Sequence, residues 1–196
     1  SPIATQDVST DQVVSSQATL NMPNFIVDKS AGYTTLGANA GNYTVSNLMH
    51  IIDGTLDVNT QTLNGGGQLT MDGGLLRISK LATSVPEILG NYNLNAGRVE
   101  LYGAGAQTLR VPIGAGSSYY ELEFTGNGIK TLAGAIEVSS ILDLDLPTTV
   151  GNYVDAAAGN LFVTNPDPAA VLRTTGGHIV GNLQRAVDGT GTYPFY

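Results

Sequence analysis

The sequence predicts an all-β protein built as a parallel β-helix, or β-solenoid, and three observations favour this fold. A short phrase of apolar, polar and apolar residues returns along the chain, and three of its copies, at Leu76, Val99 and Leu122, start 23 residues apart. Glycine makes up 25 of the 196 residues, about twice its usual share of roughly 7%. No stretch of 11 residues has helical periodicity, so we expect almost no helix.

Each copy of the phrase is a minimal strand with one buried face, because successive side chains of a strand point to opposite sides. We expect the first and third residues to be buried and the middle one to be exposed. Strands this short bury too little alone, but repeated at a near-constant period they can stack about 4.8 Å apart as the levels, or rungs, of a solenoid. The copies are Leu56-Asp57-Val58, Leu69-Thr70-Met71, Leu76-Arg77-Ile78, Val99-Glu100-Leu101, Leu122-Glu123-Phe124, Ile136-Glu137-Val138 and Leu142-Asp143-Leu144.

The domain organisation is predicted from the part of the chain in which the apolar–polar–apolar phrase repeats. Residues 1–40 are polar and lack the glycine-spaced phrases, and we expect a non-repetitive lead-in or cap, with Phe25-Ile26-Val27 as a possible first strand. Residues 41–196 form the predicted solenoid, which we expect to continue into a further domain beyond 196. The stretch 81–90 interrupts the rhythm and is expected to be a loop. Asp-Gly and Asn-Gly pairs such as Asp53-Gly54 mark turns and are also compatible with β-hairpins.

Composition excludes several function classes. Eight basic residues stand against sixteen acidic ones, and the net charge of −8 argues against a nucleic-acid partner and against an anionic membrane surface. No apolar run approaches the roughly 20 residues of a membrane-spanning helix, so we expect no membrane insertion. Cysteine is absent, which excludes disulfides, zinc–thiolate sites and thiol catalysis.

The two histidines are weak candidates for a metal site. His50 and His178 lie 128 residues apart, and no motif such as HExxH supplies further ligands. We expect both to be surface or rung-edge residues. No G-x-S-x-G nucleophile motif and no phosphate-binding glycine loop is present.

Two pairs of carboxylates are candidates for a catalytic or calcium-binding site. Glu121 and Glu123 share one face of a predicted strand, as do Asp143 and Asp145, and paired carboxylates serve both glycoside hydrolysis and calcium binding. Strand alternation alone explains all four as the outward face of strands whose leucines point inward. We therefore predict no catalytic, cofactor-binding or metal-binding residues, no cofactor and no enzymatic activity. Tyrosines are expected to be half-buried packing residues with the hydroxyl in water, not a sugar-binding stripe.

The stretch from Gly97 onward resembles the repeat of very large Bacteroidota surface proteins, which are similar to filamentous-haemagglutinin-like adhesins and are commonly exported by the type IX secretion system. The tail after Gly176 resembles the segment that follows this repeat, but it closes on Pro194-Phe195-Tyr196 where Phe-Pro is expected. The matching residues are Gly105, Gln107, Thr108, Leu109, Tyr119 or Tyr120, Leu122, Phe124, Gly128, Lys130, Thr131, Leu132, Ile136, Val138, Leu142, Leu144, Val180, Gly181, Leu183, Arg185, Gly191, Tyr193 and Phe195.

The resemblance covers about half of the chain well and residues 41–80 loosely. It implies a secreted protein at the outer cell surface, a structural or adhesive segment of a larger polypeptide whose export signal lies outside this sequence. The implied partners are neighbouring domains, other subunits, the secretion machinery and surface carbohydrate. The family supplies no catalytic residues. Two alternatives stay open from the residues: a carbohydrate-active β-helix enzyme, and a β-sandwich subunit of a pilus or filament.

Overall fold

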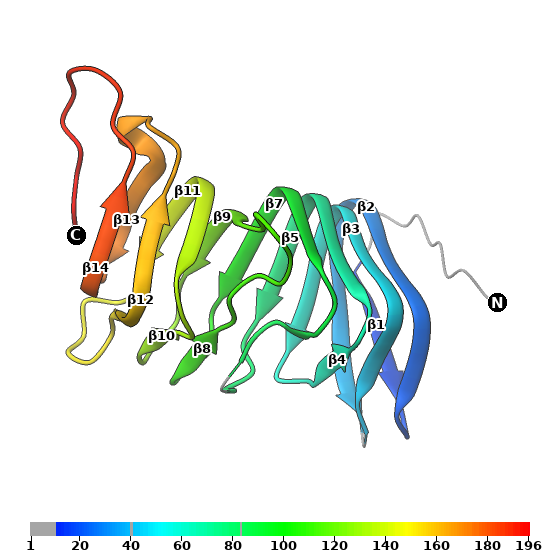
Figure 1. The fold of residues 1–196 in the computed structure, drawn as a ribbon. Helices are drawn as coiled ribbons and strands as arrows, with labels where there is room; N and C mark the ends of the chain where they lie inside the picture. The colour runs from blue at the N-terminus through cyan, green and yellow to red at the C-terminus, as the bar shows by residue number, and fades with distance from the viewer. Residues whose placement is uncertain (1–10, 40, 83) are drawn as a thin grey trace. The chain divides into compact units, whose positions relative to one another are not determined.

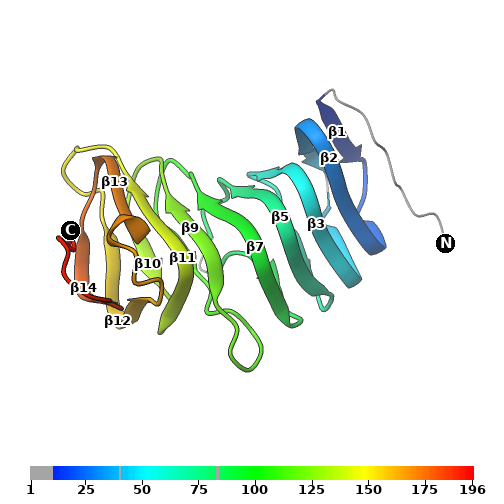
Figure 2. The same ribbon diagram turned by 90° about the horizontal axis from the view of Figure 1, so that it is seen from above.

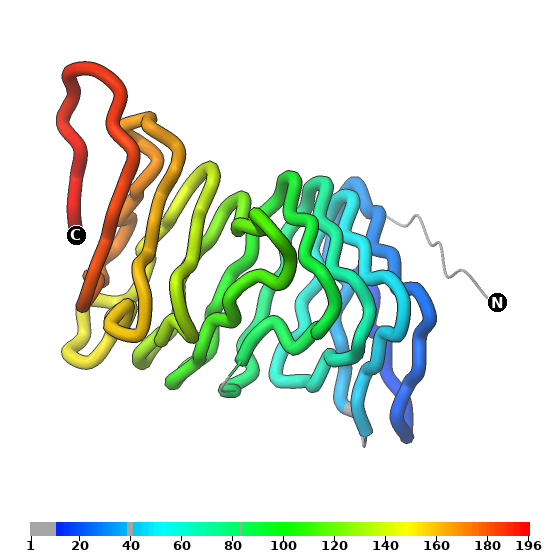
Figure 3. Tube along the Cα trace, viewed as in Figure 1, coloured from blue at the N-terminus to red at the C-terminus, as the bar shows by residue number. Residues whose placement is uncertain are grey.

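The computed structural model describes residues 11–39, 41–82 and 84–196, and its strands divide between two compact units. Unit 1 comprises Ser1–Lys80, Pro86–Arg98 and Ile113–Ser117, and unit 2 comprises Leu81–Val85, Val99–Pro112 and Ser118–Tyr196. The units interleave in sequence, and strand β7 (Tyr92–Leu101) contributes residues to both. Figure 3 shows the trace of the chain in the same colours as the ribbon of Figure 1.

Unit 1 is a stack of parallel strands. Strand β3 pairs in parallel with β2 on one side and with β5 on the other, and β1 pairs with β2 (Figure 1). A second, shorter run is formed by β3, β4 and β6, again all parallel. The strands are β1 (Gln12–Ser16), β2 (Leu20–Asn39), β3 (Tyr43–Asn59), β4 (Leu63–Gly65), β5 (Gln68–Ile78) and β6 (Glu87–Ile88).

Unit 2 repeats this plan with two parallel runs. One run is β9, β11 and β13 (Figure 2), and the other is β8, β10, β12 and β14 (Figure 1). Strand β11 also pairs with β12 at its beginning, so the two runs share a strand. The elements are β8 (Gln107–Leu109), β9 (Tyr119–Phe124), β10 (Lys130–Leu132), β11 (Ile136–Asp145), β12 (Val154–Val163), a short 3-10 helix η1 (Pro168–Ala170), β13 (Val171–Gly176) and β14 (Ile179–Arg185).

The predicted all-β parallel solenoid is confirmed, and the repeated phrase sets its register. Leu56 pairs with Leu76 in unit 1, and Leu122 pairs with Leu142 in unit 2. The first and third residues of every copy of the phrase are buried, so each rung covers the apolar face of the next. Hairpins and β-sandwiches are built from antiparallel strands, whereas the strand pairs among the described residues are parallel. The hairpin and β-sandwich alternatives are therefore wrong.

The middle residue of the phrase follows the prediction less well. Glu137 is exposed, but Glu100 and Asp143 are only 7% and 8% exposed, so the expectation that they face solvent is wrong. The Thr125 hydroxyl donates to Glu100 Oε1 at 2.7 Å, and the Thr174 hydroxyl donates to Asp143 Oδ1 at 3.3 Å. Hydroxyls from the residue after β9 and from β13 therefore supply hydrogen bonds to these two buried carboxylates.

Tight bends let long strands turn a corner of the solenoid without leaving it. Gly54 has φ +79°, a conformation that favours glycine, and a Cβ there would lie 2.6 Å from the Lys29 carbonyl oxygen. The Asp53-Gly54 pair thus marks a turn, as predicted, but the turn lies inside β3 and not between the arms of a hairpin. Close approach of the backbone of the preceding rung is why no larger residue fits.

The chain before residue 41 takes part in the parallel pairing. Strand β2, which holds Phe25-Ile26-Val27, pairs with β3, so residues 20–39 already form a rung, while residues 1–10 lie outside the described part. Within 81–90, the expected loop contains β6, which pairs with β4. Among the described residues, no helix is long and apolar enough to span a membrane.

Candidate functional site

The carboxylates of β9 and β11 lie in neighbouring rungs. Glu123 and Asp143 are partners in the parallel register, and Glu121 is paired with Ile141. Asp143 and Asp145 accept hydrogen bonds from the hydroxyls of Thr174 and Thr175 of β13. No group of three acidic or histidine side chains within the described residues is arranged to hold a metal ion. At β11, the hydrogen bonds of Asp143 and Asp145 connect neighbouring rungs.

His50 belongs to a polar ladder on the surface of unit 1. Its Nε2 lies 2.7 Å from Asp72 Oδ2, and Asn95 Nδ2 donates to Asp72 Oδ1 at 2.8 Å. The hydrogen bonds from Asn95 and His50 lower the pKa of Asp72 below its usual range. These three residues come from sequence positions 22 and 23 residues apart, so the ladder connects successive rungs.

Three tyrosines differ from the expectation that their hydroxyls face water. Tyr43, Tyr92 and Tyr119 are buried, and each hydroxyl lies within hydrogen-bond distance of one or two backbone carbonyl oxygens, which for Tyr43 are those of Val14 and Gly37. Tyr92 Oη lies 3.1 and 3.0 Å from the carbonyl oxygens of Pro86 and Ile88, and Tyr119 Oη lies 2.8 Å from that of Arg110. Burial raises the pKa of Tyr43. These rings are packing residues, as predicted, and their hydroxyls also connect them to the backbone of preceding segments of the chain.

Lys130 forms the most deeply buried cationic cluster of unit 2, named here the Lys130 clasp. Its ammonium group donates to the carbonyl oxygens of Gly103 (2.8 Å), Gly105 (3.2 Å) and Asn127 (3.0 Å) and to Gln107 Oε1 (2.8 Å). The side chain is fully buried, and burial lowers its pKa to about 8. Lys130 and Gln107 are partners in the β8–β10 register.

Arg185 forms a second internal clamp near the end of the chain. Its Nη1 donates to the Pro194 carbonyl oxygen at 3.1 Å, and its Nη2 donates to those of Asp167 (2.8 Å) and Pro168 (3.3 Å). The guanidinium lies 5.0 Å from the centre of the Tyr193 ring. Four polar residues of the resemblance therefore hold turns and chain segments together: Gln107, Lys130, Arg185 and Tyr193.

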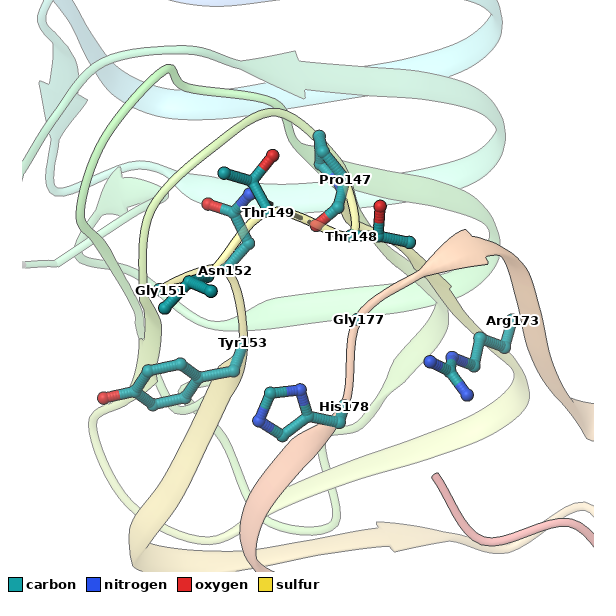
Figure 4. A pocket seen from close by; sticks show the side chains of 10 residues that line it. Pro147, Thr148, Thr149, Gly151, Asn152, Tyr153, Arg173, Gly177 and His178 are labelled. Carbon is teal, nitrogen blue, oxygen red and sulfur yellow. Dashed lines mark hydrogen bonds between the residues drawn. The ribbon is translucent and has the colours of Figure 1, made fainter.

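An open pocket of about 490 Å³ lies in unit 2, and it is named here the Arg173 pocket. It is built from the 147–153 loop, from β13 and from the turn between β13 and β14 (Figure 4). The residues that line it are Pro147, Thr148, Thr149, Val150, Gly151, Asn152, Tyr153, Arg173, Gly177 and His178.

Buried contacts fix the walls of the Arg173 pocket. Asn152 Nδ2 donates to the Pro147 carbonyl oxygen at 3.2 Å, and Asn152 Oδ1 accepts from the Gly128 amide at 2.6 Å. Gly177 has φ +87°, and a Cβ there would lie 3.0 Å from Leu146 Cβ, so the turn that carries His178 packs tightly on Leu146, the residue after β11. The loop and the turn are therefore held by the solenoid itself.

Three large side chains border the mouth of this pocket. The rings of Tyr153 and His178 are stacked, with centroids 5.7 Å apart and an interplanar angle of 26°. Their neighbours Val154 and Ile179 are partners in the β12–β14 register, which explains why residues 25 positions apart meet. Arg173 extends from β13 toward His178 (Figure 4), and its guanidinium lies 5.4 Å from the centre of the Tyr196 ring.

Sequence reasoning missed this grouping. It treated His178 as an isolated surface residue and Tyr153 as a packing residue, and it did not consider Arg173. The repeated phrase ends before Pro147, so the sequence carries no register for the last rungs; the usable signal is the roughly 25-residue spacing from Tyr153 to His178. Comparison with protein-family models, with curated proteins and with solved structures finds no match to this chain.

Proposed function

We propose that the chain is a non-catalytic structural or adhesive segment of a large secreted cell-surface protein, exported by the type IX secretion system. One observation carries the proposal: the buried polar groups Glu100, Lys130 and Asp143 are hydrogen-bonded to the chain itself. Side chains whose hydrogen bonds are used in this way stabilise the stacking of rungs and are not available to a substrate. Stacked rungs of this kind, within each unit, suit a spacer that presents other surfaces at a distance from the cell.

The resemblance of the repeat supports the location and the partners. An outer-surface or extracellular segment would contact neighbouring domains of the same polypeptide, other subunits or the secretion machinery, and surface carbohydrate. Proteinase treatment of intact source cells tests this, with detection of the segment by an antibody. We expect the segment to be digested on intact cells, and to accumulate inside cells when the secretion system is deleted. Protection from proteinase in intact, secretion-competent cells would contradict the proposal.

A carbohydrate-active β-helix enzyme is the second candidate, because acidic side chains lie in register on β9 and β11. The test is incubation of the chain with neutral and acidic polysaccharides, followed by measurement of reducing ends and unsaturated products. We expect no turnover. Turnover that is lost in Glu121→Gln, Glu123→Gln, Asp143→Asn or Asp145→Asn would overturn the non-catalytic proposal.

A further inference from the structure

We propose that the Arg173 pocket binds an acidic saccharide, with a sugar carboxylate at Arg173 and a sugar ring against Tyr153 and His178. The inference rests on the proposed adhesive function and names a ligand class for it. It is carried by three observations on the pocket: the sign of its charge, the flat rings at its mouth and the rigidity of its walls.

The charge of the pocket is opposite to that of the chain. The sequence has sixteen acidic and eight basic residues, yet the lining of the pocket includes Arg173 and His178 and no carboxylate. Arg173 is exposed, and within the described part of the chain no carboxylate forms an ion pair with its guanidinium. An arginine in this setting is a ready donor of paired hydrogen bonds to a carboxylate or sulfate group.

The rings and hydroxyls favour a sugar over other anions. Tyr153 and His178 present stacked aromatic rings beside Arg173, and the apolar face of a pyranose packs on such rings. Thr148 and Thr149 are exposed in the loop on the other side of the pocket, where their hydroxyls can donate to and accept from sugar hydroxyls. A bare phosphate ion or an acidic peptide would use Arg173 and leave the rings and hydroxyls without a role.

The walls are held before any ligand arrives. Asn152 is buried and fixes the loop through Pro147 and Gly128, while Gly177 fixes the turn against Leu146. A preformed site loses less conformational entropy on binding than one that must be ordered. The pocket is open to solvent, which allows a chain of sugars to pass across it.

The test is a titration of the isotope-labelled chain with tri-galacturonate, followed by amide chemical shifts in NMR spectra. Maltotriose serves as the uncharged sugar, and hexaglutamate as an acidic ligand without a sugar ring. The variants are Arg173→Gln and Tyr153→Ala. The matched control is Arg77→Gln, which removes an arginine of unit 1 whose Nη1 lies 3.8 Å from Asp57 Oδ2.

We expect tri-galacturonate to shift the amides of residues 148–153 and 173–178. Arg173→Gln should weaken binding about tenfold or more, since it removes a charge-assisted contact. Tyr153→Ala should also weaken binding, and Arg77→Gln should not change it. The inference is overturned if tri-galacturonate causes no shifts there, if maltotriose binds equally well, or if hexaglutamate binds equally well.

The same samples also test the non-catalytic function proposed above, independently of saccharide binding. Mass spectrometry of the sugar after the titration reports whether the trisaccharide has been cleaved. Binding with cleavage contradicts the non-catalytic proposal and supports the inference about the pocket. Absence of binding contradicts the inference and leaves the structural role of the solenoid unaffected.

Discussion

The Lys130 clasp and the Arg173 pocket both place a cation among polar groups in unit 2, but they use it in opposite ways. The ammonium group of Lys130 is fully buried and has four oxygen partners, all from the chain. The guanidinium of Arg173 is exposed, borders an open pocket and forms no ion pair within the described residues. Lys130, whose hydrogen bonds are all made within the chain, is therefore expected to stabilise the fold. Arg173, which forms no such ion pair, is available to a ligand.

The largest effect is expected from Lys130→Met. The variant keeps most of the buried volume but leaves several carbonyl oxygens in the interior without their donor, at a cost of about 3 kcal/mol in the free energy of unfolding. Denaturant melts measure this cost. The control is Lys80→Met, since Lys80 forms a partly exposed pair with Glu87 at 2.6 Å and should contribute about 1 kcal/mol or less. Equal losses of stability in both variants would contradict the difference expected between a fully buried and a partly exposed lysine.

The same lysine predicts a pH dependence of stability. Burial lowers the pKa of Lys130 to about 8 from its usual 10.5. Between these two values the unfolded chain binds the proton and the folded chain releases it, so the free energy of unfolding should increase as pH rises from about 8 to about 10. Subtracting the profile of Lys130→Met from that of the unmodified chain isolates this contribution. A difference that falls with pH across this window would show that the four oxygens hold the proton more strongly than burial expels it.

A smaller effect is expected from the buried tyrosines. Tyr92→Phe removes a hydroxyl that donates to the Pro86 and Ile88 carbonyl oxygens, and it should lower stability by about 1 kcal/mol. Tyr153→Phe is the matched change at the mouth of the pocket, where stability should stay within about 0.5 kcal/mol. Thermal melts measure both variants. If Tyr153→Phe lowers the melting temperature more than Tyr92→Phe does, the Tyr153 hydroxyl stabilises the fold, and the distinction drawn here between buried and pocket side chains is wrong.

The rungs could be predicted from the sequence because alternation within a strand is a local property. Leu122 and Phe124 are buried as the phrase predicts. Burial of Glu100 and Asp143 could not be predicted, because partners outside the phrase, such as Thr125 and Thr174, donate hydrogen bonds to these carboxylates. After Leu144, where the repeated phrase ends, the sequence also contains no pattern that predicts which residues of neighbouring rungs are paired.

The Arg173 pocket could not be predicted from the sequence, because it lies after the last copy of the repeated phrase. Tyr153, Arg173 and His178 come from a loop, a strand and a turn, and none of them belongs to a repeated motif. Their meeting depends on the β12–β14 register and on the tight packing of Gly177 against Leu146. Conversely, the polar residues that carried the resemblance, such as Gln107 and Lys130, hold the fold and do not line this pocket.

The most direct test of the difference between clasp and pocket is the melting temperature of the chain and of Arg173→Gln, each with and without tri-galacturonate. Without ligand the two should melt together, because Arg173 is not needed by the fold. With ligand at about ten times its dissociation constant, the unmodified chain should melt roughly 3–6 °C higher, and Arg173→Gln should rise clearly less. A lower melting temperature of Arg173→Gln without ligand, or equal rises in both proteins, would contradict the account.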